Sequence, residues 1–259
     1  MLRFFKRKKE IKNTITDPIV AVDYEDVTPI ADYFKNETGV TFDKQISILK
    51  NKVITFCKKR EIGSFSDLLH AIKYKEDLKQ ELIDHLTTNE TFFYREFKQI
   101  EELVALVKKR KKEVEILCAP SATGEEPYSI IIALLEAGLP KNSFHITGID
   151  INQDAIDKAK KALYKERNIR NLPLDTLNKY FTKNVNEYML KDTVKEHVDF
   201  RLMNIFDPSF CEIGKFDYIF SRNMLIYFDK ETKSRAIKIL EGLRKNSDQE
   251  IFFGHADLF

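Results

Sequence analysis

From residue 113 onward, short runs of apolar and β-branched residues alternate with segments of helical periodicity, and this alternation limits the possible folds more than any other feature. The expected strands are 114–118, 144–149, 198–203, 216–220 and 251–253. The expected helices between them are 126–137, 153–163 and 230–244. Strands that alternate with helices indicate a parallel sheet covered by helices on both faces. Residues 164–197 interrupt the alternation, so we interpret them as an insertion.

Residues 28–86 are predicted to form a small separate domain that contains only helices, because apolar side chains recur there at helical spacing. Thr28 and Asp43 are expected to cap the starts of its first two helices, and Ser64 or Ser66 is expected to open the third. Gly39 and Gly63 are expected to end these two helices, since glycine readily adopts the left-handed conformation found after a helix.

Changes in composition define both ends of this helical domain. The preceding residues, 1–27, carry six basic side chains and then a polar, acidic stretch, and we interpret them as a flexible tail. A solvated end is the simpler explanation of these charges, and contact with a membrane or nucleic acid is the alternative. Residues 87–112 are expected to form a linker and a connecting helix that lead into the sheet domain at 113–259.

Charge and composition exclude several classes of protein. The 43 Lys and Arg residues nearly balance 41 Asp and Glu, which excludes a globally basic nucleic-acid-binding protein. The longest apolar run, 130–135, is far shorter than the roughly 20 residues that span a bilayer, so no membrane insertion is expected. Three widely spaced cysteines and five unpaired histidines are typical of neither a disulfide framework nor a metal site. We therefore predict a cytoplasmic protein that binds no metal.

Residues 119–128 read Ala-Pro-Ser-Ala-Thr-Gly-Glu-Glu-Pro-Tyr and join the first strand to a helix, at the edge where parallel sheets bind ligands. The loop has neither the G-x-G-x-x-G pattern of a dinucleotide site nor the Lys-Ser/Thr ending of a P-loop. A carboxylate at Glu125 would suit a cationic amino group. A plain turn, in which Glu125 and Glu126 interact favourably with the helix dipole, explains the pattern equally well.

Asp150 ends the second predicted strand, 26 residues after Gly124. An acid at this position can accept hydrogen bonds from the two hydroxyl groups of a ribose. The alternative is a helix N-cap, a role that Asn152 would fill equally well. A ribose contact without a phosphate-binding loop points to a nucleoside cofactor, of which S-adenosylmethionine is the common one.

Four segments resemble signatures of the CheR family of chemotaxis receptor-glutamate O-methyltransferases. Residues 87–96, TTNETFFYRE, resemble the TN-x-T-x-FFR-[DE] signature, and residues 121–129, SATGEEPYS, resemble STGEEPYS. Residues 216–228, FDYIFSRNMLIYF, are similar to the FD-x-I-x-CRN-x-x-IYF run. Residues 253–255 are similar to the start of the GHSE segment, although the motif continues as Gly-His-Ala-Asp. The segments follow the order of the family and cover the chain from about residue 28.

The resemblance implies an α/β fold with the Rossmann-like sheet of S-adenosylmethionine-dependent methyltransferases, a small N-terminal all-helical domain and a small inserted subdomain. It also implies cofactor contacts from several segments. The expected cofactor-binding residues are Asn89, Thr91, Arg95, Glu125, Asp150, Asn204, Ile205, Arg222 and Asn223. Glu125 would contact the methionine amino group and Asp150 the ribose. Asn204 and Ile205 would flank the adenine.

Arg95 and Tyr227 are the catalytic residues that the resemblance implies. The acceptor would be a glutamate side chain, which has a pKa of about 4.3 and needs no general base at neutral pH. Arg95 would hold one carboxylate oxygen, and Tyr227 would lie beside the transferred methyl group. From the pattern alone, Arg95 fits a helical surface pair with Glu101 or Glu102, and Tyr227 fits a core aromatic residue.

The expected activity is the methylation of glutamate side chains on chemoreceptors for chemotactic adaptation, with S-adenosylmethionine as cofactor and S-adenosylhomocysteine as product. One alternative is a catalytically silent module that binds receptors or senses the cofactor. Another is a methyltransferase for a small carboxylic acid. The expected partner is the cytoplasmic helical domain of a chemoreceptor, without nucleic acid, and the enzyme is expected to be a monomer.

A basic face on the helix expected at 43–61 supports a receptor partner independently of the resemblance. Between Lys44 and Arg60 the sequence has six basic residues and no acidic one. At about 100° per residue, part of this charge projects away from the apolar face that begins with Ile46. The residues that do so are Lys44, Lys52, Lys58 and Lys59. A solvated face is the usual explanation, and docking on an acidic receptor surface is our hypothesis.

Overall fold

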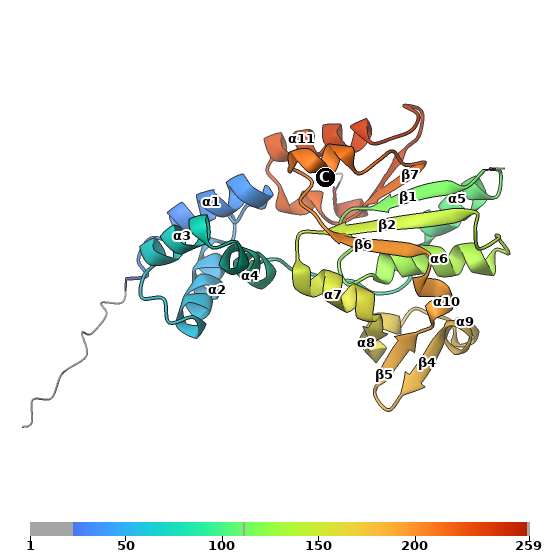
Figure 1. Ribbon diagram of the computed structural model, residues 1–259, viewed down its shortest axis with the longest axis horizontal. Coiled ribbons are helices and arrows are strands. Elements are labelled where there is room, and N and C mark those ends of the chain that lie inside the picture. The colour runs from blue at the N-terminus through green and yellow to red at the C-terminus, as the bar shows by residue number, and fades with distance from the viewer. Residues whose placement is uncertain (1–22, 111, 258–259) are drawn as a thin grey trace, which may run out of the picture.

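In the computed structural model, which describes residues 23–110 and 112–257, the main layer is a five-stranded sheet (Figure 1). Its strands are β1 (Val114–Cys118), β2 (Phe144–Asp150), β6 (Val198–Leu202), β7 (Tyr218–Ser221) and β8 (Ile251–Phe253). Their order is β6-β2-β1-β7-β8, and every pairing is parallel. The predicted α/β fold with a parallel sheet is confirmed. The strand order reverses beside β1, and ligands bind such sheets at that point.

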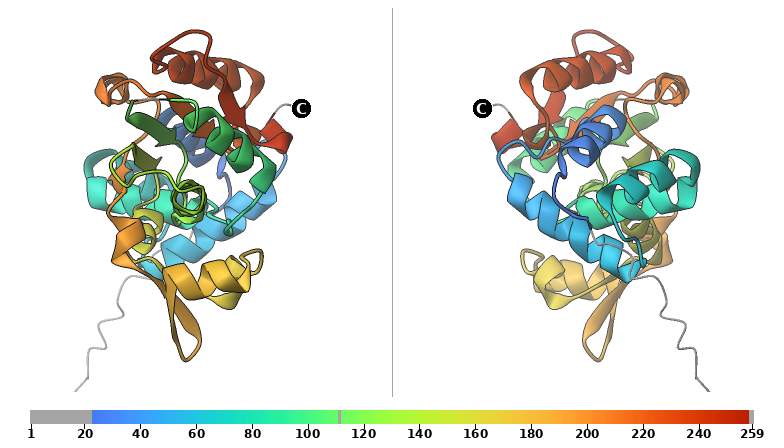
Figure 2. Two further views of the ribbon diagram at one scale, coloured as in Figure 1. Left: turned by 90° about the vertical axis from the view of Figure 1, so that its right-hand side faces the viewer. Right: turned by 90° about the vertical axis from the view of Figure 1, so that its left-hand side faces the viewer.

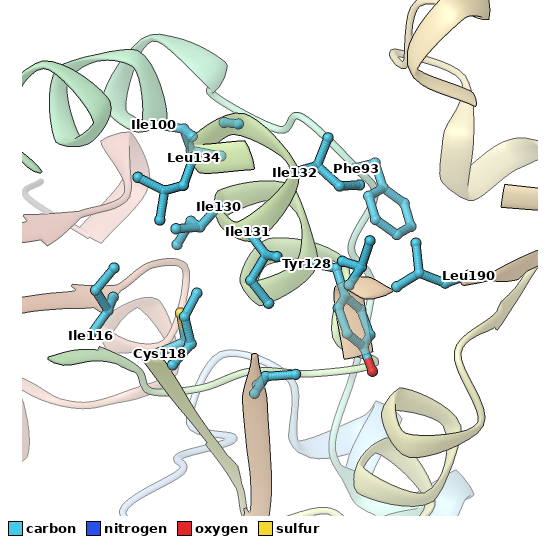
Figure 3. Packing of buried hydrophobic residues seen from close by; sticks show 14 of the residues in the cluster. Phe93, Ile100, Ile116, Cys118, Tyr128, Ile130, Ile131, Ile132, Leu134 and Leu190 are labelled. Atoms are coloured by element: carbon cyan, nitrogen blue, oxygen red, sulfur yellow. The ribbon is translucent and has the colours of Figure 1, made fainter. Parts of the chain in front are cut away.

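Alternate residues of β1 enter different cores on the two faces of the sheet. Ile116 and Cys118 face the helices α5 (Phe97–Val107), α6 (Glu125–Glu136) and α7 (Gln153–Lys161), and Figure 3 shows them opposite the apolar side chains of α6. Leu117 belongs to the core on the other face, with α11 (Lys230–Gly242). Both faces are buried, which is why the strands read as nearly continuous apolar runs.

The N-terminal region forms a four-helix unit with its own core. Its helices are α1 (Thr28–Thr38), α2 (Ile46–Lys59), α3 (Phe65–Tyr74) and α4 (Glu76–Leu86). Phe34, Leu49 and Leu68 lie at the centre of this core with at most 1% exposure. The unit faces the carboxyl ends of the parallel strands (Figure 1). None of the helices in the described part of the chain is long and apolar enough to cross a bilayer.

Two of the predicted boundary signals in this unit are correct. Gly39 follows α1 in the left-handed conformation with φ of 77°, as predicted. A Cβ atom on Gly39 would lie 2.9 Å from Cγ2 of Thr232 in the other domain, so the close approach also requires glycine. Ser64 caps α3, and its hydroxyl accepts a hydrogen bond from the Asp67 N–H.

The other signals are wrong. The N-cap of α1 is Val27 and not Thr28. α2 begins three residues after Asp43, at Ile46, with no side-chain cap from the described residues. The left-handed residue that follows α2 is Glu61, with φ of 55°, and not Gly63. This conformation of Glu61 lets the Ile62 N–H donate to the Cys57 carbonyl and so end the helix. The left-handed residue in such a helix ending is usually glycine.

The predicted tail, 1–27, is wrong for its last five residues. The Asp23 N–H donates to the Gly63 carbonyl, and the Asp23 carbonyl accepts from the Phe65 N–H. Val27 is only 4% exposed within the core of the helical domain. The remaining part of the predicted tail, 1–22, lies outside the described residues.

The expected basic face is also partly wrong, because α2 begins at Ile46. Lys44 therefore lies in the preceding turn, and Ile46, which was expected on the apolar face, is 44% exposed. The Lys52 ammonium donates to the Leu86 carbonyl at 3.1 Å and is tied to α4. Lys58 and Lys59 are exposed in the last turn of α2, as expected.

The interruption of the βα alternation forms a second, antiparallel sheet in the order β3-β5-β4. Its elements are β3 (Leu163–Tyr164), α8 (Glu166–Ile169), α9 (Leu174–Tyr180), β4 (Phe181–Asn184), β5 (Glu187–Leu190) and α10 (Asp192–Lys195). Figure 2 shows the β4–β5 hairpin extending away from the parallel sheet. The fully buried Phe93 ring contacts the rings of Tyr164 and Phe181 edge to face, at 4.8 and 5.3 Å. These contacts fix the subdomain to the linker before α5.

Candidate functional site

Two adjoining cavities lie where the helical domain meets the carboxyl ends of the strands. The larger cavity has a volume of about 610 Å³ and the smaller one of about 310 Å³. Their shared wall comes from the loops that follow α4, β1 and β7. It consists of Thr88, Asn89, Pro120, Ala122, Asn223, Ile226 and Tyr227. Because the strand order reverses between β1 and β7, the loops after these strands diverge and leave room for a ligand.

The loop after β1 is fixed to the end of β2. The Ser121 N–H donates to the Ile149 carbonyl at 2.7 Å, and the Ala122 N–H donates to Oδ2 of Asp150 at 2.9 Å. Gly148 allows this approach, since a Cβ atom there would lie 3.0 Å from Cβ of Ser121. Ala122 has a φ of 45°, an uncommon conformation for a residue with a side chain and one that often marks functional loops.

Asp150 lies in the wall of the larger cavity and is only 6% exposed. Its Oδ1 accepts a hydrogen bond from the Asn152 N–H at 3.0 Å. Asn152 is the N-cap of α7 and accepts from the Ala155 N–H, so the alternative role of Asp150 as that cap is wrong. Burial raises the pKa of Asp150 to about 6. A neutral or positively charged hydrogen-bond donor in the cavity would stabilise its ionised form.

Glu125 and Glu126, at the start of α6, point in different directions. Glu125 is fully buried and is not part of the lining of either cavity. It accepts hydrogen bonds from the Thr123 hydroxyl at 2.6 Å and from the Asn168 amide of the inserted subdomain at 2.7 Å. Burial raises the pKa of Glu125, and these two hydrogen bonds oppose the shift.

Glu126 lines the smaller cavity, although the sequence interpretation gave it no ligand role. Its Oε2 lies 2.9 Å from Nε of Arg222, whereas its buried Oε1 has no hydrogen-bond partner among the described residues. Burial raises the pKa of Glu126, and the Arg222 charge opposes that shift. The sequence holds no signal that separates the two glutamates, because neighbouring helical residues differ in direction by about 100° and the orientation depends on the tertiary structure.

The segment after β7 contributes to both cavities. Arg222 is 6% exposed in the smaller cavity and donates from Nη2 to the Arg95 carbonyl at 2.6 Å. Asn223 has a φ of 59° and lines both cavities. Tyr227 also lines both and is 37% exposed, so it is not a core aromatic residue. Partial burial raises the pKa of Tyr227, which therefore stays a neutral phenol at neutral pH.

The linker before α5 supplies Thr91 and Arg95 to the smaller cavity and Asn89 to both. Arg95 precedes α5 and its Nη1 donates to the Glu90 carbonyl at 3.3 Å, so it does not form the helical surface pair. The aromatic ring of Phe92 lies beneath two guanidinium groups, with Arg170 at 3.6 Å and Arg95 at 5.8 Å from its centroid. The lining of the smaller cavity contains the guanidinium groups of Arg95 and Arg222 together with the carboxylates of Glu90 and Glu126.

Asn204 and Ile205, which follow β6, lie in the wall of the larger cavity. The Asn204 amide donates to the Glu37 carbonyl at 2.6 Å, so it also joins the sheet to the helical domain. Lys44 and Lys52 line the same cavity from the helical side, whereas Lys58 and Lys59 lie outside the lining of both cavities. The four lysines expected on one docking face therefore occupy two different places.

These residues fit a ligand that carries hydroxyl groups and a cationic amino group. Asp150 offers carboxylate oxygens to the larger cavity, and the unpartnered Oε1 of Glu126 is a buried acceptor beside the smaller one. An unpaired buried acceptor costs about 1–3 kcal/mol, which a bound ammonium group would recover. Across residues 23–110 and 112–257, no three His, Cys, Asp or Glu side chains gather closely enough to hold a metal ion.

Comparison with known proteins identifies a family and its members. The family model described as "CheR methyltransferase, SAM binding domain" matches residues 89–259. A chemotaxis protein methyltransferase of Campylobacter jejuni strain 81-176 is 37% identical over 231 residues, which cover 85% of this chain and 84% of the relative. Chemotaxis protein methyltransferase 2 of Vibrio cholerae is 33% identical over 241 residues, or 87% of this chain and 83% of the relative. The chemotaxis protein methyltransferase of Escherichia coli K12 is 29% identical, with 77% of this chain and 71% of the relative covered.

The pKa of Asp150 predicts how the affinity for S-adenosylmethionine depends on pH. Ribose hydroxyl groups would donate to the ionised carboxylate, so binding favours loss of its proton. Affinity should therefore fall as the pH drops through about 6, approaching a tenfold loss per pH unit below that value. Calorimetric titration from about pH 8 to pH 5 measures this dependence.

The control is Asp150→Asn, which has no proton to take up in this range. Its affinity should be lower than that of the wild type by about 1–3 kcal/mol at pH 8 and nearly constant down to pH 5. Equal pH profiles for the two proteins would contradict a ribose contact at Asp150.

Proposed function

Because the chain belongs to the CheR methyltransferase family, we propose that it transfers methyl groups to glutamate side chains of chemoreceptors. It is an S-adenosylmethionine-dependent methyltransferase. One observation supports the proposed acceptor most directly: the cavity lined by Asp150 adjoins a second one lined by Arg95 and Tyr227. The first provides acceptors for the cofactor, and the second is suited to a carboxylate. A binding module without catalysis would not need the second cavity.

For the cofactor, we propose that the nucleoside lies in the larger cavity and the amino acid part near the smaller one. Asp150 would accept hydrogen bonds from the ribose, and Asn204 and Ile205 would flank the adenine. The carboxylate that receives the amino group would be Glu126 and not Glu125, because Oε1 of Glu126 is the buried carboxylate oxygen without a partner among the described cavity residues. When bound, S-adenosylmethionine supplies a methyl group on a positively charged sulfur.

For the acceptor, we propose that Arg95 binds one oxygen of the substrate carboxylate while the other oxygen attacks the methyl carbon. The glutamate is already ionised at neutral pH, so this chain need not remove a proton. Tyr227 lies at the junction of the cavities and would orient the attacking oxygen. The reactants carry opposite charges that cancel as the methyl group moves, and a site from which water is excluded favours that change.

For the partner, we propose an acidic helical surface of the receptor's cytoplasmic domain that meets the end of α2. Lys58 and Lys59 are exposed there, and Arg60 follows them. Lys44 and Lys52 would instead act on the cofactor side, since they line the larger cavity. Exposed charges at the rim of an interface mainly change the association rate and the choice of partner.

The direct test combines this protein, purified chemoreceptor cytoplasmic domain and S-adenosylmethionine labelled in its methyl group. We expect base-labile label on the receptor, as methyl esters require. Arg95→Ala should lower the transfer rate by about 10²–10³-fold, the usual effect of losing one donor to the reacting oxygens, with little change in cofactor affinity. Arg201→Ala is the control, because Arg201 is exposed on β6 and outside both cavities. Receptor without label, under conditions where the cofactor binds, would rule out the proposed activity.

The two neighbouring glutamates give a second prediction. Glu126→Gln should weaken S-adenosylmethionine binding by about tenfold or more, since it removes a charged hydrogen bond worth roughly 1.5–3 kcal/mol. Glu125→Gln keeps the same shape one residue away, so its affinity should stay close to that of the wild type. Calorimetry on both variants, with circular dichroism to verify folding, decides between them. A larger loss in Glu125→Gln would restore the role that the resemblance implies for that residue.

The proposed docking surface is tested by charge reversal at Lys58 and Lys59. The double variant to Glu should raise the KM for receptor by several-fold and weaken the dependence of that KM on salt. Salt weakens interactions between exposed charges, which at 0.1 M are largely screened beyond about 10 Å. Its affinity for S-adenosylmethionine should not change. The same reversal at Lys108 and Lys109, an exposed pair after α5, alters the net charge equally and is the control. Equal kinetics for both double variants would show that α2 does not dock the receptor.

A further inference from the structure

Asp257, in the 3-10 turn η3 (His255–Asp257), is buried beneath the segment that follows β7. It is 2% exposed, and its Oδ2 accepts hydrogen bonds from the N–H of Asn223 at 2.5 Å and of Gly254 at 3.0 Å. Its Oδ1 accepts from the Ile226 N–H at 3.3 Å. A single carboxylate therefore binds the main chain at both ends of the stretch from Asn223 to Ile226.

This stretch needs such a partner because of its own conformation. Asn223 has a φ of 59°, a left-handed conformation that is uncommon for a residue with a side chain. The next residues form the 3-10 turn η2 (Leu225–Tyr227), whose first N–H groups have no partner within the turn. A carboxylate at this end of the turn satisfies those N–H groups and interacts favourably with their dipoles.

The surroundings hold Asp257 in place. A Cβ atom on Gly254 would lie 2.9 Å from Oδ2 of Asp257 and 3.0 Å from the Asn223 nitrogen, so only glycine leaves room for the carboxylate. The Lys233 ammonium on α11 donates to the Asp257 carbonyl at 2.8 Å. Gly254 therefore leaves the space that the Asp257 carboxylate occupies. Together, residues 254–257 support the loop after β7.

We propose that Asp257 is a positioning residue for methyl transfer, which fixes the Asn223–Tyr227 backbone so that Asn223 and Tyr227 lie at the junction of the two cavities. Asp257 itself is not part of the lining of either cavity. It acts through the main chain, and it touches neither the proposed cofactor site nor the proposed acceptor site. The inference rests on the proposed function, because Tyr227 is proposed there to orient the attacking oxygen.

The test compares Asp257→Asn with Asp257→Glu. Asparagine keeps the size but replaces one acceptor oxygen by an NH₂ group, which cannot accept from the main-chain N–H groups. We expect its kcat, counted per molecule that binds S-adenosylmethionine, to fall by about 10–100-fold, since displacement of reacting groups by about 1 Å can cost that much. The KM for receptor should change less than about threefold, the size of a surface effect. Glutamate keeps the carboxylate and should retain most of the wild-type kcat.

A purely structural role predicts a different result. Asp257→Asn would then unfold more easily, but each molecule that binds the cofactor would keep the wild-type kcat, and this outcome would overturn the proposal. Equal losses in Asp257→Asn and Asp257→Glu would also overturn it. If Asp257→Asn does not fold, Lys233→Met removes only the hydrogen bond to the Asp257 carbonyl. It should lower kcat in the same direction without changing cofactor affinity, and an unchanged kcat would overturn the proposal.

A second measurement does not depend on the receptor. Amide hydrogen exchange at Asn223 or Ile226 should be faster by about tenfold or more in Asp257→Asn, because one of these two N–H groups loses its acceptor oxygen. If the wild-type protein fails to methylate receptor, the proposed function is wrong, while the exchange rates still test the hydrogen bonds of Asp257. Unchanged exchange at both amides would overturn the positioning role whatever the acceptor is.

Discussion

The cavities depend on hydrogen bonds between the helical domain and the carboxyl edge of the parallel sheet. On one side, Asn204 binds the Glu37 carbonyl and the Thr41 N–H binds the Tyr227 carbonyl. On the other side, the side-chain amide of Asn152 donates to the main-chain carbonyl of Asp84. The Gln153 N–H donates to the carboxylate of Asp84. The exposed ion pair between Lys35 and Asp229 adds little to this interface, since such pairs contribute about 0–1 kcal/mol. Three of these four hydrogen bonds use a side-chain amide or carboxylate, from Asn204, Asn152 and Asp84, so the position of the helical domain depends on these polar residues.

The buried charges of the site are incompletely satisfied by the protein itself. Asp150 and Glu126 both have raised pKa values because burial removes them from water. Arg222 pairs with Glu126, yet a buried pair with spare acceptors is costly to maintain. A ligand with hydroxyl groups and an ammonium group would supply the missing donors. Hydrogen bonds from such a ligand to these buried carboxylates would be stronger than the same bonds in water, because the dielectric constant inside the protein is lower.

Much of the fold and part of the site were predictable from sequence, because both depend on local patterns. Periodicity located β1, β2 and the helices that cover them. The end of β2 singled out Asp150 and the resemblance singled out Arg222 and Asn223, and these three residues line the two adjoining cavities. The prediction did not extend to features that depend on distant parts of the chain. Whether Glu125 or Glu126 faces the cavity depends on how α6 is rotated against the sheet and the inserted subdomain, through contacts such as that with Asn168.

Similar reasons explain the other errors. Val27 was assigned to the tail because its partners in the core of the helical domain lie elsewhere in the sequence. Gly63 was expected to end α2, but Glu61 adopts the left-handed conformation that is usually found in glycine. Lys44 and Lys52 follow a simple charge pattern, but the turn before α2 and the carbonyl of Leu86 direct them toward the cavity. The aspartate at 257 looked like a departure from a family signature. Only the folded chain brings it beneath residues more than 30 positions away.

The larger cavity takes its walls from both domains, whereas the family model for cofactor binding begins at residue 89. Residues from Thr38 to Lys52 complete the cavity from outside that model. The helical domain is therefore not a freely exchangeable module. A chimera that received this domain from another relative would inherit a foreign wall around the larger cavity, so exchange of the helical domain would change the shape of that cavity.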